Sequence, residues 1–215
     1  MATALTEFYD EVRSRVPGCP SSILQRETLN VLRDICERTN IWKDDLDAID
    51  VVADTAEYAL TAPSGADFVK GNPVDTAYFN DVPIGATTKK LLDATGVEWQ
   101  SRSSSTPSSF FIIYPSTVRL YPTPSEDTSE GLDIYAVLKP SLDATTVEDF
   151  FYDNHRDAVI AGVLARIFNQ NGQPWYNDIA AKEENINYRK EVASILAEVQ
   201  RGHVTTGLRA QPRDW

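Results

Sequence analysis

The stretch AVIAGVLARIF, from Ala158 to Phe168, decides the fold because it is apolar on nearly every side when wound into a helix. A helix of this kind is stable only when neighbouring elements enclose it. Gly162 lies in its middle, where glycine costs roughly 1 kcal/mol against alanine but permits another helix to cross closely. The stretch therefore predicts a buried helix with other helices packed around it.

Helical periodicity continues on both sides of this stretch. Thr145 and Glu148 have the T-x-x-E spacing of a capping box, which predicts where the helical region begins. Asn171-Gly172 is predicted to end it, and Pro174 to open a further helix that runs to about Arg201. That last helix is expected to bury one apolar stripe, formed by Ile179, Ile186, Val192, Ile195, Leu196 and Val199.

Two more helices are predicted near the N-terminus. The first covers about residues 5–16 and is stopped by Pro17 and Gly18. The second begins at Ser22, which forms an S-x-x-Q capping box with Gln25, and ends near Arg38. Its apolar face has helical spacing and comprises Ile23, Leu24, Thr28, Val31, Leu32, Ile35 and Cys36.

The middle of the chain instead holds short runs of β-branched and aromatic residues, bounded by Pro, Gly, Asp and Ser. Residues 132–139 alternate between two faces, as a strand with one buried face does. Residues 110–121 predict a hairpin that turns at 114–117, where Pro115 pre-sets the first turn position. The predicted strands are 46–52, 56–60, 74–79, 110–114, 118–121 and 132–139.

These patterns together predict an α+β protein: a four-helix bundle from the N- and C-terminal segments, with an inserted antiparallel β module and a flexible C-terminal tail. Helices at both ends of a chain pair most economically into one bundle. The expected units are the N-terminal bundle helices (1–45), the inserted β module (46–144), the C-terminal bundle helices (145–201) and an extended tail (202–215).

The overall charge is strongly negative, at −12 with a pI near 4.6. A general nucleic-acid binder needs a basic footprint, so this balance argues against one. No apolar run approaches the roughly 20 residues of a membrane helix, and the start MATALTEFYD lacks the pattern of a signal peptide. We expect a soluble protein, made in a cytoplasm and without a membrane role, in which Cys36 is a buried apolar residue.

Residues with catalytic or metal-binding potential are few and scattered. Neither His155 nor His203 has partners at the spacing of a known metal motif. A G-x-S-x-G elbow is absent, and the run from Gly85 to Lys90 lacks the second glycine of a phosphate loop. The sequence therefore predicts no catalytic residue, no cofactor and no metal site, and a protein that is not an enzyme.

Tryptophans are the candidate interaction residues, because they are enriched where proteins bind one another. Trp42, Trp99 and Trp175 lie at loop-like or boundary positions, where they either contact a partner or anchor the core. Trp215 ends a polar tail that also carries Arg209 and Arg213. These three tail residues are expected to dock into a partner.

Three stretches carry a resemblance to a known family. Residues 5–39 hold a short helix, a loop and an amphipathic helix. Residues 106–124 run from a T-P loop through aromatics to R-L-Y-P-T-P, and residues 150–201 form two helices joined by G-Q-P-W-Y. Together they resemble the head-to-tail adaptor subunits of tailed bacteriophages, also known as tail tubular protein A-like proteins or head–tail connectors. The segment 64–106 is longer than in that family's pattern.

This resemblance implies a structural virion protein at the neck, the interface between head and tail. It implies a ring, expected to hold twelve copies, between the portal protein and a tail nozzle or tail tube protein. Tail fibres or spikes are further partners. Genomic DNA is non-specific cargo passing through the lumen, and an acidic lumen would let it slide without capture. The tail with Arg209, Arg213 and Trp215 is the expected portal-binding segment.

Two alternatives from other classes remain open at this point. The β module could bind a glycan or another small ligand in a receptor-binding accessory protein, with a site lined by aromatics: Tyr78, Phe79, Trp99 and Tyr135. An enzyme is the third alternative, and His155 is its best candidate residue.

Overall fold

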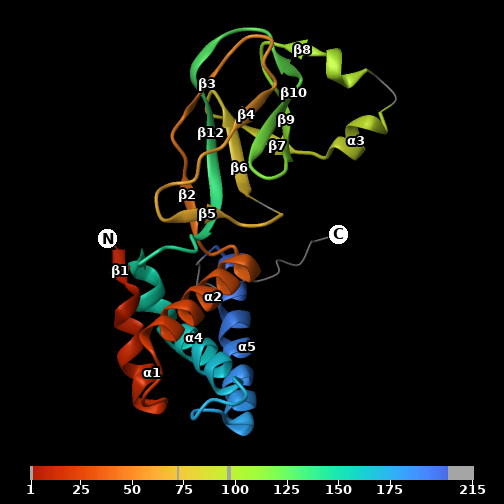
Figure 1. Cartoon of the computed structure of the whole chain (residues 1–215). Helices are drawn as coiled ribbons and strands as arrows, with labels where there is room; N and C mark the ends of the chain where they lie inside the picture. The colour runs from red at the N-terminus through yellow and green to blue at the C-terminus, as the bar shows by residue number, and fades with distance from the viewer. Residues whose placement is uncertain (1, 72, 96–97, 203–215) are drawn as a thin grey trace, which may run out of the picture.

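Helices gather at one end of the molecule and strands at the other in the computed structural model (Figure 1). The structure describes residues 2–71, 73–95 and 98–202. Both chain ends of the described part lie in the helical part. The chain leaves this part after α2, forms the strands and returns through a long strand, β12.

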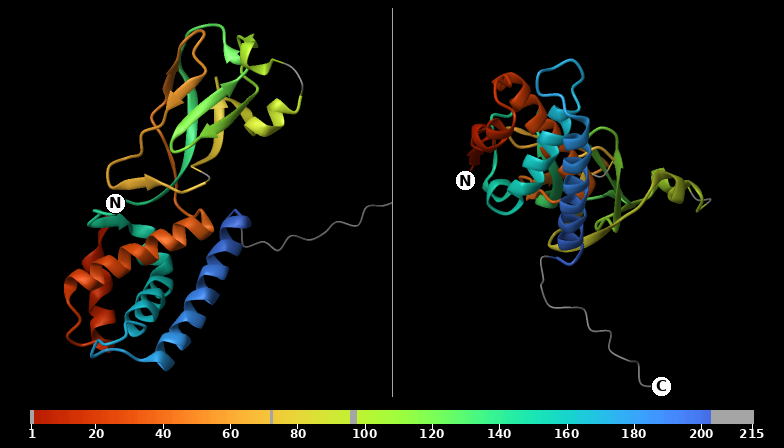
Figure 2. Two further views of the ribbon diagram at one scale, coloured as in Figure 1. Left: turned by 45° about the vertical axis from the view of Figure 1, so that its right-hand side comes forward. Right: turned by 90° about the horizontal axis from the view of Figure 1, so that it is seen from below.

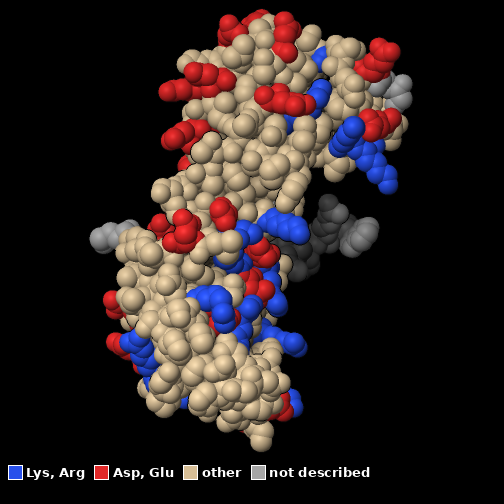
Figure 3. Space-filling model, in the orientation of Figure 1, with Lys and Arg blue, Asp and Glu red and all other residues tan. Residues whose placement is uncertain are grey.

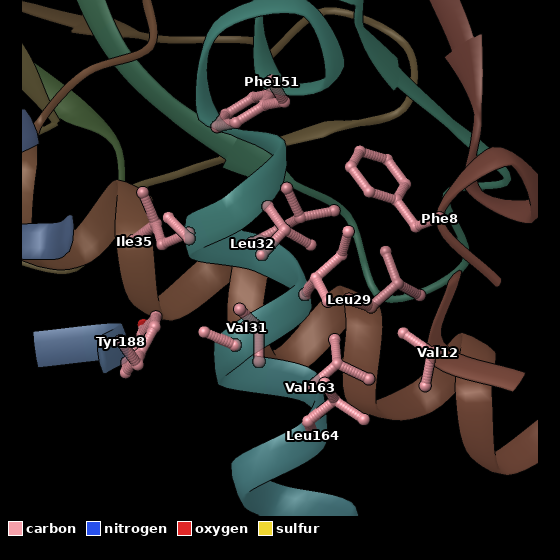
Figure 4. Close-up of a cluster of buried hydrophobic side chains, with 14 of the residues drawn as sticks. Phe8, Val12, Leu29, Val31, Leu32, Ile35, Phe151, Val163, Leu164 and Tyr188 are labelled. Carbon is pink, nitrogen blue, oxygen red and sulfur yellow. The ribbon is translucent and has the colours of Figure 1, made fainter. Parts of the chain in front are cut away.

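The helical part is built around α4, which the sequence predicted to be enclosed. Its residues from Ala158 to Ala165 are all buried, and α2 and α5 pack along it (Figure 2). Figure 4 shows Val31, Leu32 and Ile35 of α2 in one cluster of buried side chains with Val163 and Leu164 of α4. The helices are η1 (Leu5–Phe8), α1 (Tyr9–Arg15), α2 (Ser21–Thr39), α4 (Asp149–Phe168) and α5 (Asp178–Gln200).

Gly162 allows the three long helices to meet closely. A Cβ atom built at this position would lie 2.7 Å from Val31 Cγ1 and 2.9 Å from the ring of Tyr188. These distances are shorter than van der Waals contact, so no larger residue fits without displacing the side chain of Val31 or Tyr188.

The strands form one curled sheet with nine members among the described residues. Its main path is β2-β12-β6-β7-β9-β10-β4, and β3 and β5 also pair with β12. All of these pairs are antiparallel except β7 with β9. The strands of this sheet are β2 (Lys43–Asp45), β3 (Ile49–Val51), β4 (Glu57–Ala59), β5 (Ala66–Phe68), β6 (Val74–Phe79), β7 (Val82–Ala86), β9 (Ser109–Ile113), β10 (Thr117–Tyr121) and β12 (Thr128–Pro140).

Smaller elements complete the strand part and its attachment. An arm made of α3 (Lys89–Asp93) and η2 (Trp99–Ser101) projects from the sheet (Figure 1). β8 (Ser103–Ser104) pairs in parallel with β11 (Thr123–Pro124). β1 (Ala2–Ala4) pairs with β13 (Thr146–Glu148), which places the start of the chain beside the start of α4.

β12 connects the strand part to the helical part. Leu132 and Ile134 lie in the core of the sheet, whereas Val137 is buried in the core of the helices. Next to it, Lys139 forms an ion pair with Glu37 of α2. One strand thus contributes to both cores.

The predicted four-helix bundle with an inserted β module is wrong. The described residues form a mixed α/β structure with a large curled sheet and five α-helices. α1 has only seven residues, about two turns, which is too short for a bundle helix of the expected kind. The sheet is not an insertion on a separate bundle, because β12 enters the helical core, and it is not purely antiparallel.

Among the predicted local features, the hairpin is present in the structure and the two capping boxes are not. The hairpin is confirmed, with β9 and β10 antiparallel from Ser109↔Tyr121 to Ile113↔Thr117. Both capping boxes are wrong: α2 begins after Pro20 without a side-chain cap, and α4 begins after β13. Residues 146–148 pair with β1 instead, and this long-range pairing overrides the local capping pattern. Of the predicted tail, 203–215 lies outside the described residues.

Candidate interaction surfaces

Candidate metal ligands in the described part of the chain do not gather at one site. No set of His, Cys, Asp or Glu side chains there is arranged to hold a metal ion. His155 is buried in α4, at a residue with non-helical backbone angles, and its ring lies 6.2 Å from that of Phe150. His203 lies outside the described residues. None of the helices described is both long and apolar enough to span a bilayer.

The clearest pKa perturbations belong to groups inside the helical core. Burial is the main cause that raises the pKa of Tyr188 well above its usual value, and a hydrogen bond of 2.6 Å to Asp34 adds to it. Burial likewise raises the pKa of the Cys36 thiol, so this side chain stays protonated. Both residues contribute packing between helices.

Two of the three candidate tryptophans lie against the helical core and remain half-buried. Trp42 packs edge-to-face on Phe151, with ring centroids 6.2 Å apart, where the helical part meets β12. Trp175 packs beside the start of α5 and its indole N–H donates to Gln170 Oε1 at 3.3 Å.

Trp99 is buried and holds the arm onto the sheet. Its ring packs edge-to-face on Phe111 and Tyr121, and the guanidinium of Arg119 lies 5.1 Å from its centroid. Its indole N–H donates a 2.8 Å hydrogen bond to Asp93 of α3. Arg209, Arg213 and Trp215, the candidate tail residues, lie outside the described residues.

The four aromatics of the alternative ligand site do not come together. Tyr78 and Tyr135 are neighbours on β6 and β12, with ring centroids 6.0 Å apart. Phe79 is buried in the core of the sheet instead. Trp99 belongs to a separate cluster with Leu92 and Phe111.

Charge is divided unevenly between the two parts. Residues 43–148 hold 17 Asp and Glu against 7 Lys and Arg, a net charge of −10 out of −12 for the whole chain. Figure 3 shows clusters of Asp and Glu over the strand part, whereas Lys and Arg mix with Asp and Glu over the helical part. The protein is therefore an acidic strand part on a nearly neutral helical part.

A basic groove lies where α2, α4 and α5 meet. Its cavity of about 230 Å³ is lined by one carboxylate, Asp34, and three guanidinium groups, Arg38, Arg166 and Arg189. Asp34 is already engaged, because it accepts a hydrogen bond from Tyr188 and pairs with Arg38 at 3.0 Å. The groove therefore keeps a net positive charge.

The apolar residues of α5 do not form the single buried stripe that the sequence predicted. Val192 and Ile195 are buried against α4 and α2, whereas Ile179 and Ile186 are 72% and 67% exposed. Leu196 is exposed as well. The spacing of these residues already indicates two separate apolar faces, because positions 179 and 186 are seven apart and lie almost opposite position 188 on a helix. The predicted single stripe therefore combined residues of the buried face and of the exposed face of α5.

Comparison with known proteins gives one result that covers almost the whole chain. Residues 5–212 match the family described as SU10 adaptor protein. The chain matches none of the curated proteins.

Proposed function

The chain belongs to the SU10 adaptor protein family, a family of phage adaptors, and we propose that it forms the ring joining the head of the virion to its tail. In this proposal twelve copies sit between the portal protein and a tail nozzle or tail tube protein. The family match carries the proposal, because it extends over both the helical and the strand part.

The shape and charge of the chain suit this role. A ring that closes by rotation needs two different faces on each subunit. The helical part has α1 on one side and α5 on the opposite side (Figure 1). The acidic strand part suits a lumen or tail-facing surface, since it repels the phosphate backbone and would let DNA pass without capture.

The proposed role is passive and requires no catalysis. The protein would act by holding neighbours in place, with portal, tail protein and further copies of itself as partners. Fibres or spikes would be additional partners of the strand part. The tail residues Arg209, Arg213 and Trp215 would bind the portal protein.

A reconstitution with portal protein tests the proposal. The full chain is mixed with the portal protein of the same phage, and the mixture is analysed by sedimentation and electron microscopy. We expect a ring of this chain coaxial with the portal ring. A chain that neither co-sediments with portal nor occurs in particles of the phage neck would refute the proposal.

A further inference from the structure

Helix α5 carries apolar residues on two opposite faces. The inner face includes Ala181, Tyr188, Val192 and Ile195, all buried. The outer face is formed by residues at intervals of seven and four, which place them opposite Tyr188: Ile179, Ile186, Ala193 and Ala197.

Within the described part of the chain, this outer face is exposed. Ile179 and Ile186 are the most exposed large apolar side chains of this helix, and Ala193 between Ile186 and the C-terminal turn is exposed too. A helix that is apolar on two opposite sides gains stability from neighbours on both sides. Among the described residues, only the inner face has such neighbours, α2 and α4.

Basic residues flank this outer face. Arg189 and Lys190 follow Ile186 on either side of the apolar line and form no ion pair among the described residues. Arg166 of α4 adds a third cation in the adjoining groove. Glu183 is the acidic exception on this surface.

Carboxylates without ion pairs in the described structure lie at the other side of the helical part. Contacts between Phe8 and Tyr152, and between Glu11 and Arg156, join η1 and α1 to the first half of α4. Four exposed acidic residues surround these contacts: Glu7, Asp10, Asp153 and Asp157. Of the basic residues of α1, Arg15 is already paired with Glu184, and Arg13 donates to the neutral Ser21 hydroxyl and keeps its charge. The four carboxylates outnumber this one remaining cation.

The two surfaces face in opposite directions, because α1 and α5 form opposite sides of the helical part (Figures 1 and 2). We infer that the outer face of α5 binds the acidic η1–α1–α4 surface of a second copy of this chain. Ile179 and Ile186 supply the apolar area of this contact, and Arg189 and Lys190 face Asp153 and Asp157. The contact is heterologous, so repeating it builds a ring. The inference rests on the proposed ring function and assigns the surface that forms it.

The apolar part of the contact is tested with two variants of α5. Each adds one negative charge, and the two substitutions are at neighbouring residues. Ile186→Glu places a carboxylate on the outer face, whereas Asn187→Glu places it on an exposed position to one side. Ring assembly of the full chain on portal is followed by sedimentation velocity and negative-stain microscopy. We expect at least a tenfold weaker assembly for Ile186→Glu and wild-type rings for Asn187→Glu. Circular dichroism confirms that each variant is folded, and Ile179→Asn serves as a second outer-face variant.

The electrostatic half is tested by charge reversal in trans. Arg189→Glu with Lys190→Glu reverses one face, and Asp153→Lys with Asp157→Lys reverses the other. Each double variant alone is expected to lose rings, because like charges then oppose each other. An equimolar mixture is expected to restore rings with alternating 1:1 composition, since every contact is again complementary.

The possible outcomes distinguish a failure of the assigned α5 surface from a failure of the proposed ring function. If the wild-type chain forms no ring with portal, the proposed function fails, and the inference with it. Wild-type rings that persist in Ile186→Glu and in both charge-reversed variants would overturn the inference alone. Variants that fail singly but are not rescued by mixing would show that these two faces do not meet.

Discussion

The Tyr188 hydroxyl of α5 donates a 2.6 Å hydrogen bond to the Asp34 carboxylate of α2. This bond spans the crossing point of three helices, beside Gly162 of α4. It buries the inner face of α5 and thereby fixes which residues of that helix point outward. The geometry of this crossing therefore determines the surface that we assign to ring assembly.

Replacing Gly162 by alanine should destabilise the protein, although alanine is the better helix former. The added Cβ meets Val31 and Tyr188 at less than 3 Å, and overpacking of this kind costs about 1–3 kcal/mol, more than the gain in helix propensity. The free energy of unfolding, measured with urea, should fall by about 1 kcal/mol or more. Gly85→Ala is the control, because its Cβ would have an ordinary contact at 3.9 Å. An unchanged or raised stability of Gly162→Ala would contradict the close crossing.

The Tyr188→Phe variant should lose stability at neutral pH and become less sensitive to alkaline pH. Removing the hydroxyl costs about 1 kcal/mol, the typical net value of one hydrogen bond. Burial raises the pKa of Tyr188 in the folded state above its usual value near 10, so the folded state keeps a proton that the unfolded state loses. The stabilising contribution is complete below pH 10 and falls as the pH rises above it. Urea titrations between pH 8 and 11 should show a smaller decline for Tyr188→Phe than for the wild type. Equal slopes would contradict the assignment.

Glu37→Ala should destabilise the junction between β12 and α2 more than a typical surface substitution. Its partner Lys139 is 7% exposed, so removal of the carboxylate leaves a buried ammonium without its ion pair. We expect a loss of about 1–3 kcal/mol in the free energy of unfolding. In a Lys139→Met background the same substitution should cost much less, which a double-mutant cycle measures. A coupling energy near zero would show that the pair contributes nothing.

Trp99→Ala should release the arm formed by α3 and η2. The ring is buried against Phe111 and Tyr121, and truncation of a buried tryptophan costs about 3–5 kcal/mol. Trypsin should then cleave faster at Lys89, Lys90 and Arg102, as followed by mass spectrometry of the fragments. Trp175→Ala is the control, since this residue lies in the helical part and should leave those sites protected. Unchanged cleavage would mean that other contacts hold the arm.

Deleting residues 203–215 should weaken portal binding and leave thermal stability unchanged. The segment carries the candidate residues Arg209, Arg213 and Trp215, which contribute at least a tenfold gain in affinity under the proposed function. Surface plasmon resonance on immobilised portal gives the affinity, and circular dichroism gives the melting temperature. The triple substitution of these residues by alanine should reproduce the deletion. Portal binding at wild-type strength in both variants would exclude the tail as the portal-binding segment.

The sequence by itself determined the parts whose signals are local. The all-round apolar stretch from Ala158 to Phe168 became the enclosed helix α4, and residues 110–121 became a hairpin. In these cases the pattern and its partner lie within a few residues of each other, so periodicity and turn residues are sufficient. The acidic composition of residues 43–148 is likewise a property of the sequence alone.

Only the tertiary structure decided how distant segments pair and which face of each helix is covered. β12 pairs with β2, β3, β5 and β6, and β7 pairs in parallel with β9, although no local pattern specifies such partners. Pairing of residues 146–148 with β1 likewise overrode a capping box. In α5, the crossing at Gly162 turned Tyr188 inward and left Ile179 and Ile186 outside. Periodicity identifies apolar faces, but burial depends on contacts between residues far apart in the chain, and only the folded arrangement brings those residues together.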